Sequence, residues 1–130
     1  MKRKGTCAEM KLPVETFVSG TIVQVDFPYR DKDESKSRPA VVMDFDENVT
    51  HVILLQVTSH EPRTQYDYEI TVYEDTGLSK EPSVVRCNCV YTIPNDQLLQ
   101  KIGILTRNDL LGVELLYNQA LEDVAIENYN

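Results

Sequence analysis

Residues 19–59 read SGTIVQVDFPYRDKDESKSRPAVVMDFDENVTHVILLQVTS. Apolar and polar residues alternate over 21–27, which predicts a β-strand entered through Gly20. The runs at 40–45 and 51–57 are more continuously apolar and predict two largely buried strands. A charged stretch from Arg30 to Ser37 predicts a solvated loop between the first two strands, and a tight turn separates the second from the third. We expect the start of the second strand and the end of the third to meet.

The remainder of the chain continues the strand pattern and then changes period. Further strands are predicted at 66–72, 83–93 and 101–105, with a short helical turn after Pro94. Apolar residues then recur at helical spacing to about residue 123, behind a T-x-x-D capping box at Thr106. Six short strands and one helix predict a mainly β protein, a small curved antiparallel sheet or barrel with a C-terminal helix.

Length and composition indicate one domain with no membrane span. The 130 residues fit a single core. We assign 1–16 to an N-terminal tail, 17–124 to the barrel domain and 125–130 to a C-terminal tail. No apolar stretch approaches the roughly 18 residues of a membrane span, and no signal peptide is recognisable at the start. A cytoplasmic protein is expected.

Charge and cysteine content restrict the partners and cofactors. A net charge of -8 opposes long-range attraction to nucleic acid. Four cations from Arg30 to Arg38 nevertheless leave room for a local phosphate site. The chain has three cysteines and two histidines, without the spacing of a four-ligand metal site. Cys87 and Cys89 are interpreted as half-buried residues sharing one strand face, so we expect no metal and no other cofactor.

Several motifs in order resemble those of the MazF/PemK toxin family. They are G-T-I-V-x-V-D-F in the first strand, S-R-P-A-V-V in the second, V-T-S closing the third, S-V-V-R-x-N-x-V-Y-T-I, and K-I-G-x-L. The resemblance covers about residues 17–123. It implies an SH3-like small β-barrel of the PemK/CcdB type that forms a homodimer. It further implies a metal-independent endoribonuclease that cuts single-stranded mRNA, held inactive by a cognate antitoxin protein.

The same resemblance assigns roles to named residues. It implies that Arg38 and Thr58 carry the reaction, with Ser59 able to act like Thr58, and that the products end in a 2′,3′-cyclic phosphate and a 5′-hydroxyl. Arginine suits charge stabilisation better than base catalysis, because its pKa of about 12.5 or higher keeps it protonated. Contacts to RNA are expected from Tyr29, Arg30, Lys32, Lys36, Ser37, Arg86 and Tyr91.

Plainer interpretations of these residues remain open. An arginine before a strand is commonly a surface charge, and Thr-Ser at a strand end is commonly a turn cap. His60 is more readily a loop residue than a base, and Tyr66 and Tyr68 suit a core or dimer contact as well as base stacking. The alternative for the whole chain is a catalytically silent barrel that acts by binding a protein, as gyrase poisons of this fold do, or in regulation.

Overall fold

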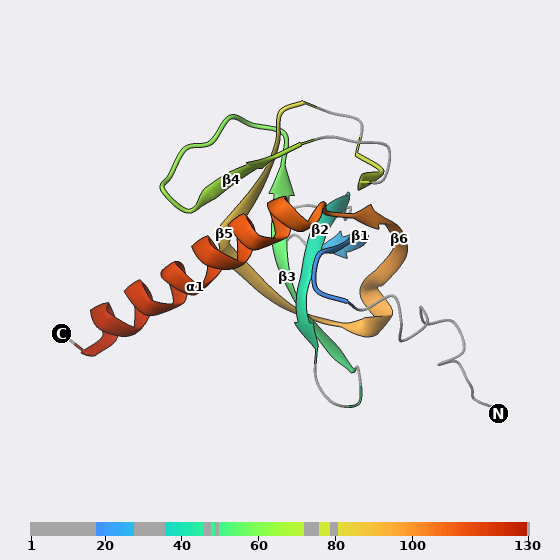
Figure 1. The fold of residues 1–130 in the computed structure, drawn as a ribbon. Coiled ribbons are helices and arrows are strands. Elements are labelled where there is room, and N and C mark those ends of the chain that lie inside the picture. Colours follow the sequence, from blue (N-terminus) through green and yellow to red (C-terminus); the bar gives the residue numbers. More distant parts are fainter. Residues whose placement is uncertain are drawn as a thin grey trace.

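The computed structural model describes residues 18–27, 36–45, 48, 50–71, 76–78 and 81–129. Within them the elements, in chain order, are β1 (Thr21–Phe27), β2 (Lys36–Phe45), β3 (His51–Thr58), β4 (Asp67–Ile70), β5 (Ser83–Pro94), a single 3-10 turn (Asn95–Gln97), β6 (Leu98–Ile104) and α1 (Arg107–Tyr129). The strands form one antiparallel sheet in the order β4-β5-β3-β2-β1-β6 (Figure 1). The predicted class, mainly β with a C-terminal helix, is confirmed.

Strand alternation gives the curled sheet two apolar faces, and each face has its own core. One core gathers Val23, Val25, Ala40, Val42, Val52, Leu54, Ile93 and Leu98. The other, on the face that α1 covers, gathers Ile22, Val41, Met43, Leu55, Val57, Ile70, Val85, Cys87, Leu105 and Val113. Because β3 contributes fully buried side chains to both cores, its sequence is apolar almost throughout, as predicted for a central strand.

The sheet is not closed by strand pairing in the described part of the chain, since its edge strands β4 and β6 do not pair. Segment 76–78 lies against β6, and a Cβ atom added at Gly77 would come within 2.7 Å of Ile102 Cγ2. Gly77 also has a φ of 70°, which favours glycine. The barrel-like shape therefore comes from a close contact that only a residue without a side chain permits.

A β-bulge in β2 sets the register that matters for the site. Asp44 pairs with Ile53 and Val42 pairs with Leu54, so Met43 is an extra residue on β2. The Met43 carbonyl accepts a hydrogen bond from Ser19 Oγ at 2.8 Å, which satisfies a backbone group that the bulge takes out of the ladder. Beyond the bulge the pairing is regular as far as Ala40 and Gln56.

β2 begins earlier than its apolar pattern predicts. Lys36 pairs with Phe27 of β1, and Arg38 pairs with Val25. The strand therefore includes Lys36 to Pro39, outside the predicted strand that begins at Ala40. Backbone pairing with β1 requires no apolar side chain, which explains why the charged end of the stretch is still part of the sheet.

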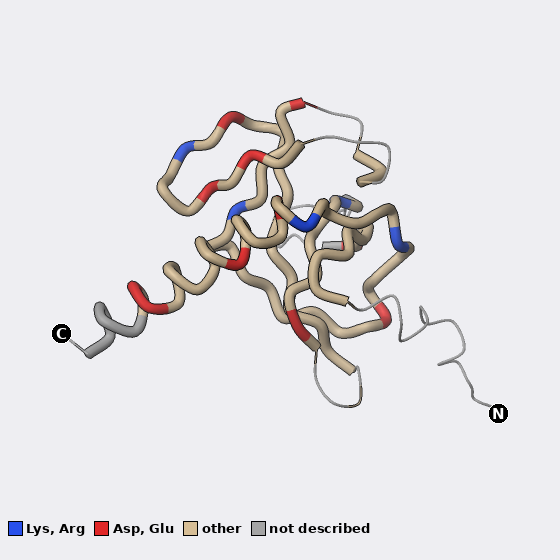
Figure 2. The backbone as a smooth tube through the Cα atoms, in the orientation of Figure 1, with Lys and Arg blue, Asp and Glu red and all other residues tan. Residues whose placement is uncertain are grey.

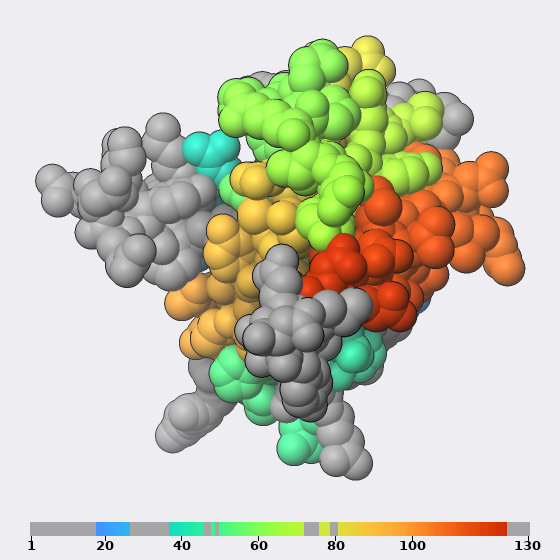
Figure 3. All heavy atoms as spheres, turned by 90° about the vertical axis from the view of Figure 1, so that its left-hand side faces the viewer, coloured from blue at the N-terminus to red at the C-terminus, as the bar shows by residue number. Residues whose placement is uncertain are grey.

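Helix α1 is fixed to the sheet through β4 and the segments beside it. Thr106 Oγ1 accepts a hydrogen bond from the Asp109 backbone N–H at 3.2 Å, which confirms the predicted N-cap. The Asp109 carboxylate accepts from Tyr68 Oη at 3.0 Å and from the Thr71 backbone N–H at 2.9 Å. The view in Figure 3 shows the β3–β4 connection and β4 lying directly over the helix.

The helix continues beyond its predicted end. It runs to Tyr129, through residues that the sequence pattern assigned to a C-terminal tail. Neither proline nor glycine follows Gly112 before the last residue, so the backbone meets no residue that stops a helix. None of the helices in the described residues is long and apolar enough to cross a membrane.

β5 is interrupted by a second irregularity, at the cysteines. Arg86 pairs with Gln56 whereas Val90 pairs with Leu55, so residues 87–89 form a bulge on β5. Cys87 is fully buried in the core beneath α1, and Cys89 is half-buried. Burial, aided by the negative charge of Asp67, raises the pKa of the Cys87 thiol to about 12. A thiol of that kind is inert at neutral pH.

Candidate active site

The β2–β3 register brings the two predicted catalytic residues together. Ala40 pairs with Gln56, and continuing the antiparallel register by two residues places Arg38 opposite Thr58. Residues directly opposite each other project to the same face of a sheet. Thr58 also pairs with Val84 of β5, so a neighbouring strand supports its backbone.

A pocket of about 310 Å³ opens where these strands end. It is lined by Gln24, Ser37, Arg38, Pro39, Val57, Thr58, Ser59, Gly77, Leu78, Ser83 and Ile102. Four of these, Ser37, Arg38, Thr58 and Ser59, were predicted as site residues from sequence. The volume lies at the small end of the range for ligand sites, so the pocket fits one small organic group.

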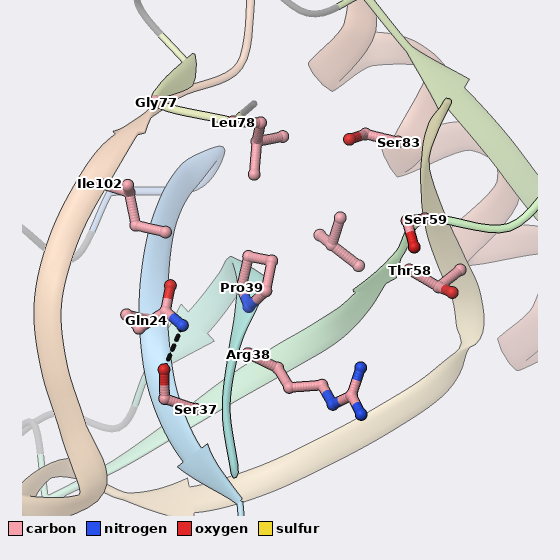
Figure 4. Close-up of a pocket in the computed structure, with 11 residues that line it drawn as sticks. Gln24, Ser37, Arg38, Pro39, Thr58, Ser59, Gly77, Leu78, Ser83 and Ile102 are labelled. Atoms are coloured by element: carbon pink, nitrogen blue, oxygen red, sulfur yellow. Dashed lines mark hydrogen bonds between the residues drawn. The ribbon is translucent and has the colours of Figure 1, made fainter. Parts of the chain in front are cut away.

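The side chains divide the pocket into a polar and an apolar side (Figure 4). The Arg38 guanidinium extends away from Gln24, toward the side where Thr58 and Ser59 lie. Leu78 and Ile102 point inward on the other side, with the Pro39 ring between the two sides. Arg38 is exposed and Thr58 half-buried, so an approaching anion can reach both.

Thr58 has a local partner as well. Its Oγ1 accepts a hydrogen bond from the His60 backbone N–H at 3.4 Å, which is the turn-capping role considered from sequence. A hydroxyl that accepts one hydrogen bond still has its own proton to donate. The cap therefore holds the Thr58 side chain in place and leaves it able to donate to a phosphate oxygen.

The other seven residues of the lining were not predicted as site residues. Gln24 lies on β1 opposite Pro39 and donates from its amide nitrogen to Ser37 Oγ, as the dashed line in Figure 4 shows. Leu78 and Ile102 look like core residues by pattern, and Ser83 is 3% exposed. Gly77 lies between the strands predicted at 66–72 and 83–93. Only the strand order, in which β1 lies between β2 and β6, shows that these residues share a pocket.

Arg86 and Tyr91, predicted to contact RNA, do not line the pocket. The Arg86 Nε atom lies 3.8 Å from Asp67 Oδ1, and that carboxylate also accepts hydrogen bonds from the backbone N–H groups of Arg63 and Thr64. Arg86 thus helps to hold the connection between β3 and β4. Tyr91 pairs with Leu54, toward the end of β5 away from Thr58. An RNA contact by either residue stays a prediction.

The remaining predicted contacts lie partly or wholly outside the described residues. Tyr29, Arg30 and Lys32 lie outside them, and for Lys36 only the backbone is described. Lys36 begins β2, two residues before Arg38, so its backbone is near the pocket.

The other side chains weighed from sequence have structural roles or lie apart. His60 is exposed and does not line the pocket. Tyr66 and Tyr68 pack against the core beneath α1 and donate hydrogen bonds to Asp123 and Asp109 of the helix. These two tyrosines therefore fix the helix.

Comparison with known proteins gives a matching family and several similar folds. Residues 19–120 match the model of the PemK-like, MazF-like toxins of type II toxin–antitoxin systems. No curated protein sequence compared with the chain matches it. Solved structures do resemble it. Among them is a MazE–MazF complex from Deinococcus radiodurans with a TM-score of 0.67 and 16% identity over 80% of this chain and 94% of that one.

Two mycobacterial structures are similar to a comparable degree. An endoribonuclease in complex with its cognate antitoxin gives a TM-score of 0.66 at 14% identity, over 81% of this chain and 94% of that one. The Mycobacterium tuberculosis toxin MazF-mt6 gives 0.58 at 24%, over 81% and 97%. At these identities the likeness shows the shared fold, whereas the matched model covers most of the sequence. The chain belongs to the PemK-like, MazF-like toxin family of type II toxin–antitoxin systems.

Proposed function

We propose that this chain is a metal-independent endoribonuclease that cuts single-stranded mRNA at specific sequences. The presence of both Arg38 and Thr58 in the lining of one pocket is the observation that supports this most directly. The products are a 2′,3′-cyclic phosphate and a 5′-hydroxyl. They form when the ribose 2′-hydroxyl gives up its proton to solvent and its oxygen bonds to the adjacent phosphorus. The bond from phosphorus to the 5′-oxygen breaks, and the 5′-oxygen takes up a proton.

Arg38 stabilises the negative charge that develops on the phosphate during this attack. A guanidinium offers a planar fork of donors that matches two non-bridging oxygens. Its charge persists at any physiological pH, so the stabilisation needs no proton to be placed beforehand. Removing one such donor from a hydrolytic site typically lowers turnover by roughly a hundred- to a thousandfold. Arg38 is also positioned to protonate the leaving 5′-oxygen as a secondary role.

Thr58 and Ser59 orient the phosphate and the 2′-hydroxyl. Neither a carboxylate nor an imidazole is present among the described residues that line the pocket. Catalysis by this site therefore depends chiefly on positioning and charge stabilisation, with general-base assistance contributing less. Arg30, Lys32 and Lys36 are proposed to follow the RNA backbone on the way to the pocket.

The partners follow from the family and from its solved complexes. The solved structures reported above include an endoribonuclease with its cognate antitoxin and a MazE–MazF complex. We propose that a cognate antitoxin likewise silences this chain, that the toxin is a homodimer, and that it acts in the cytoplasm. An antitoxin segment that covers Arg38 would exclude RNA from the pocket.

Cleavage of a mixed single-stranded RNA in excess EDTA tests the proposal. We expect discrete cuts, and fragments whose 5′ ends accept phosphate from a polynucleotide kinase without prior phosphatase treatment. Arg38→Ala should lower the cleavage rate by at least a hundredfold. Arg63→Ala is the matched control, since Arg63 is exposed and lies outside the pocket lining; it should cut like the wild type.

Uncut RNA, or cutting unaffected by Arg38→Ala, contradicts the proposal. The alternative of a silent barrel that binds a protein makes the opposite prediction in cells. Growth inhibition that survives Arg38→Ala would favour that alternative, whereas inhibition lost with Arg38 supports the nuclease.

A further inference from the structure

The start of β2, which carries Arg38, is held in the sheet chiefly by β1. The described pairs between β2 and β3 end at Ala40, whereas the pairs between β2 and β1 continue through Arg38 as far as Lys36. Pro39, the residue next to Arg38, has no backbone N–H and can donate to neither neighbouring strand. The ladder therefore lacks one donor directly beside Arg38.

A side-chain hydrogen bond joins β1 and β2 at this point. Gln24 of β1 pairs with Pro39, and its amide nitrogen donates to Ser37 Oγ, two residues nearer the start of β2 (Figure 4). Residues in such diagonal positions lie roughly 7–8 Å apart, a distance that a long side chain can span. The hydrogen bond therefore ties β2 to β1 one residue before Arg38.

Gln24 belongs to a strand that is itself held on both sides. Its backbone pairs with Gln100 of β6 as well as with Pro39 of β2. Its half-buried side chain lines the pocket together with Pro39 and with Ile102, the extra residue at a bulge in β6. Ser37, in contrast, is exposed. The bond thus fastens an exposed strand end to a supported inner strand.

The bond acts on Arg38 through the backbone. Successive residues of a strand project to opposite faces, so Ser37 and Arg38 point apart. The guanidinium extends away from Gln24, toward the side where Thr58 and Ser59 lie (Figure 4). A shift of the backbone at Ser37 would carry the base of the arginine side chain with it. A misplacement of about 1 Å in a reacting geometry can lower turnover by about 100-fold.

We infer that Gln24 is a positioning residue: by holding Ser37, it keeps the start of β2 on β1 and the Arg38 guanidinium at the scissile phosphate. The inference rests on the proposed function, because the reaction that Gln24 supports is the one proposed for Arg38. It assigns to Gln24 no contact with the RNA.

Single-turnover cleavage rates of variants that break or keep this bond test the inference. Gln24→Leu removes the donor and Ser37→Ala removes the acceptor, so each should lower the rate about 10- to 100-fold. The double variant should be no slower than Gln24→Leu alone, because both changes break one bond. Ser37→Thr keeps a hydroxyl and should recover most of the rate lost in Ser37→Ala.

The same change in an Arg38→Ala background separates positioning from a direct contact with RNA. If Gln24 acts through Arg38, Gln24→Leu should change the rate of Arg38→Ala by less than about twofold. Gln100→Leu is the matched control, since Gln100 pairs with Gln24 but is exposed and does not line the pocket. It should cut like the wild type.

A wild-type rate in Gln24→Leu, or a further loss of about tenfold when it is added to Arg38→Ala, overturns the inference and leaves the nuclease proposal intact. If Gln24→Leu does not fold, Ser37→Ala breaks the same bond at an exposed position and takes its place in both comparisons.

A wild type that cuts nothing overturns the nuclease proposal, and NMR relaxation then decides whether Gln24 holds Arg38. The order parameters of the Ser37 and Arg38 backbone amides should fall from about 0.85 toward about 0.6 in Gln24→Leu. They should stay at the wild-type values in Gln100→Leu. Unchanged order parameters in Gln24→Leu overturn the inference.

Discussion

Gly112 of α1 lies beneath the ring of Tyr68, where a Cβ atom would come within 2.6 Å of Tyr68 Cζ. Alanine normally stabilises a helix relative to glycine by about 1 kcal/mol. Here it must displace a ring that is hydrogen-bonded to Asp109, so we expect Gly112→Ala to lower the free energy of unfolding by about 1–3 kcal/mol. In a Tyr68→Ala background the same change should stabilise by about 1 kcal/mol. Denaturant unfolding of the four proteins checks this reversal of sign.

Cys87 gives the fold a defined sensitivity to alkali. The thiol has an ordinary pKa of 9.0, which burial raises to about 12 in the folded protein. Between these values the unfolded chain loses a proton that the folded chain keeps, so the free energy of unfolding falls as pH rises above 9. The fall is at most about 1.4 kcal/mol per pH unit. Cys87→Val should flatten this dependence between pH 8 and 10 in urea titrations.

Cys89→Val, at a half-buried position in the same bulge, is the control for that measurement and should retain the wild-type slope. The urea titrations are limited to pH 10 because tyrosine also begins to ionise there. Tyr68 has an ordinary pKa of 10.0, and burial, with the hydrogen bond to Asp109, raises its pKa in the folded protein. Ionisation of tyrosine adds to the loss of stability beyond that point. An equal slope in wild type and Cys87→Val would show that the thiol does not cause the sensitivity.

At the scale of single residues, the sequence predicted a site residue where a polar side chain stands at a recognisable strand end. Arg38 before a proline and Thr58 at the end of an apolar run are visible as strand-end polar residues, and the structure places both in one pocket. Gln24 carried no such signal, because a polar residue in an alternating strand is ordinarily solvent-facing. Gln24 lines the pocket because residues distant in sequence, in β6 and segment 76–78, lie nearby.

Among the elements, α1 depends on a single buried carboxylate. Asp109 is 6% exposed and accepts hydrogen bonds from Tyr68 and from the Thr71 backbone. Hydrogen bonds to charged groups contribute about 1.5–3 kcal/mol. We expect Asp109→Ala to lower the free energy of unfolding by about 2 kcal/mol and to speed hydrogen exchange in β4 before the other strands. Glu122→Ala, an exposed acid on the same helix, should change stability by less than about 0.5 kcal/mol.

The type of each element could be predicted from the periodicity of the sequence, whereas the residues at which elements begin and end were predicted less well. All six strands and the helix were predicted, because each buries one face or both and so shows a period. β2 starts at Lys36 and α1 ends at Tyr129, both beyond the predicted limits. These ends are set by backbone pairing and by the absence of a helix breaker. Neither backbone pairing nor the absence of a helix breaker leaves an apolar pattern in the sequence.

For the whole molecule, charge and RNA affinity act against each other. Acidic and basic positions are interspersed along the described backbone, with acids on the second half of α1 (Figure 2). The net charge of -8 repels RNA at long range. The RNA binding that we propose must therefore come from local contacts, and Arg38 is proposed as one of them. Each phosphate neutralised on a single strand contributes about -0.7 to the slope of log K against log salt concentration.

We expect Arg38→Ala to reduce the magnitude of that slope by about 0.7, measured by fluorescence anisotropy with a fully 2′-O-methylated oligonucleotide that cannot be cut. Replacing both Arg30 and Lys32 by alanine should reduce it further if they follow the RNA backbone as proposed. Arg63→Ala should leave the slope unchanged. A wild-type slope in Arg38→Ala would show that the guanidinium does not contact phosphate in the bound state.

The extra residue at Met43 has a consequence for chain length. If Met43 paired in step with its neighbours and no bulge formed, the register of Asp44 with Ile53 would continue and place Pro39, not Arg38, opposite Thr58. Deleting Met43 should therefore straighten β2 and keep Arg38 opposite Thr58. Deleting Asn48 from the β2–β3 connection, by contrast, strains the turn or shifts every pair between the two strands. The spacing of twenty positions between Arg38 and Thr58 therefore suits this register only because the bulge takes up one residue of β2.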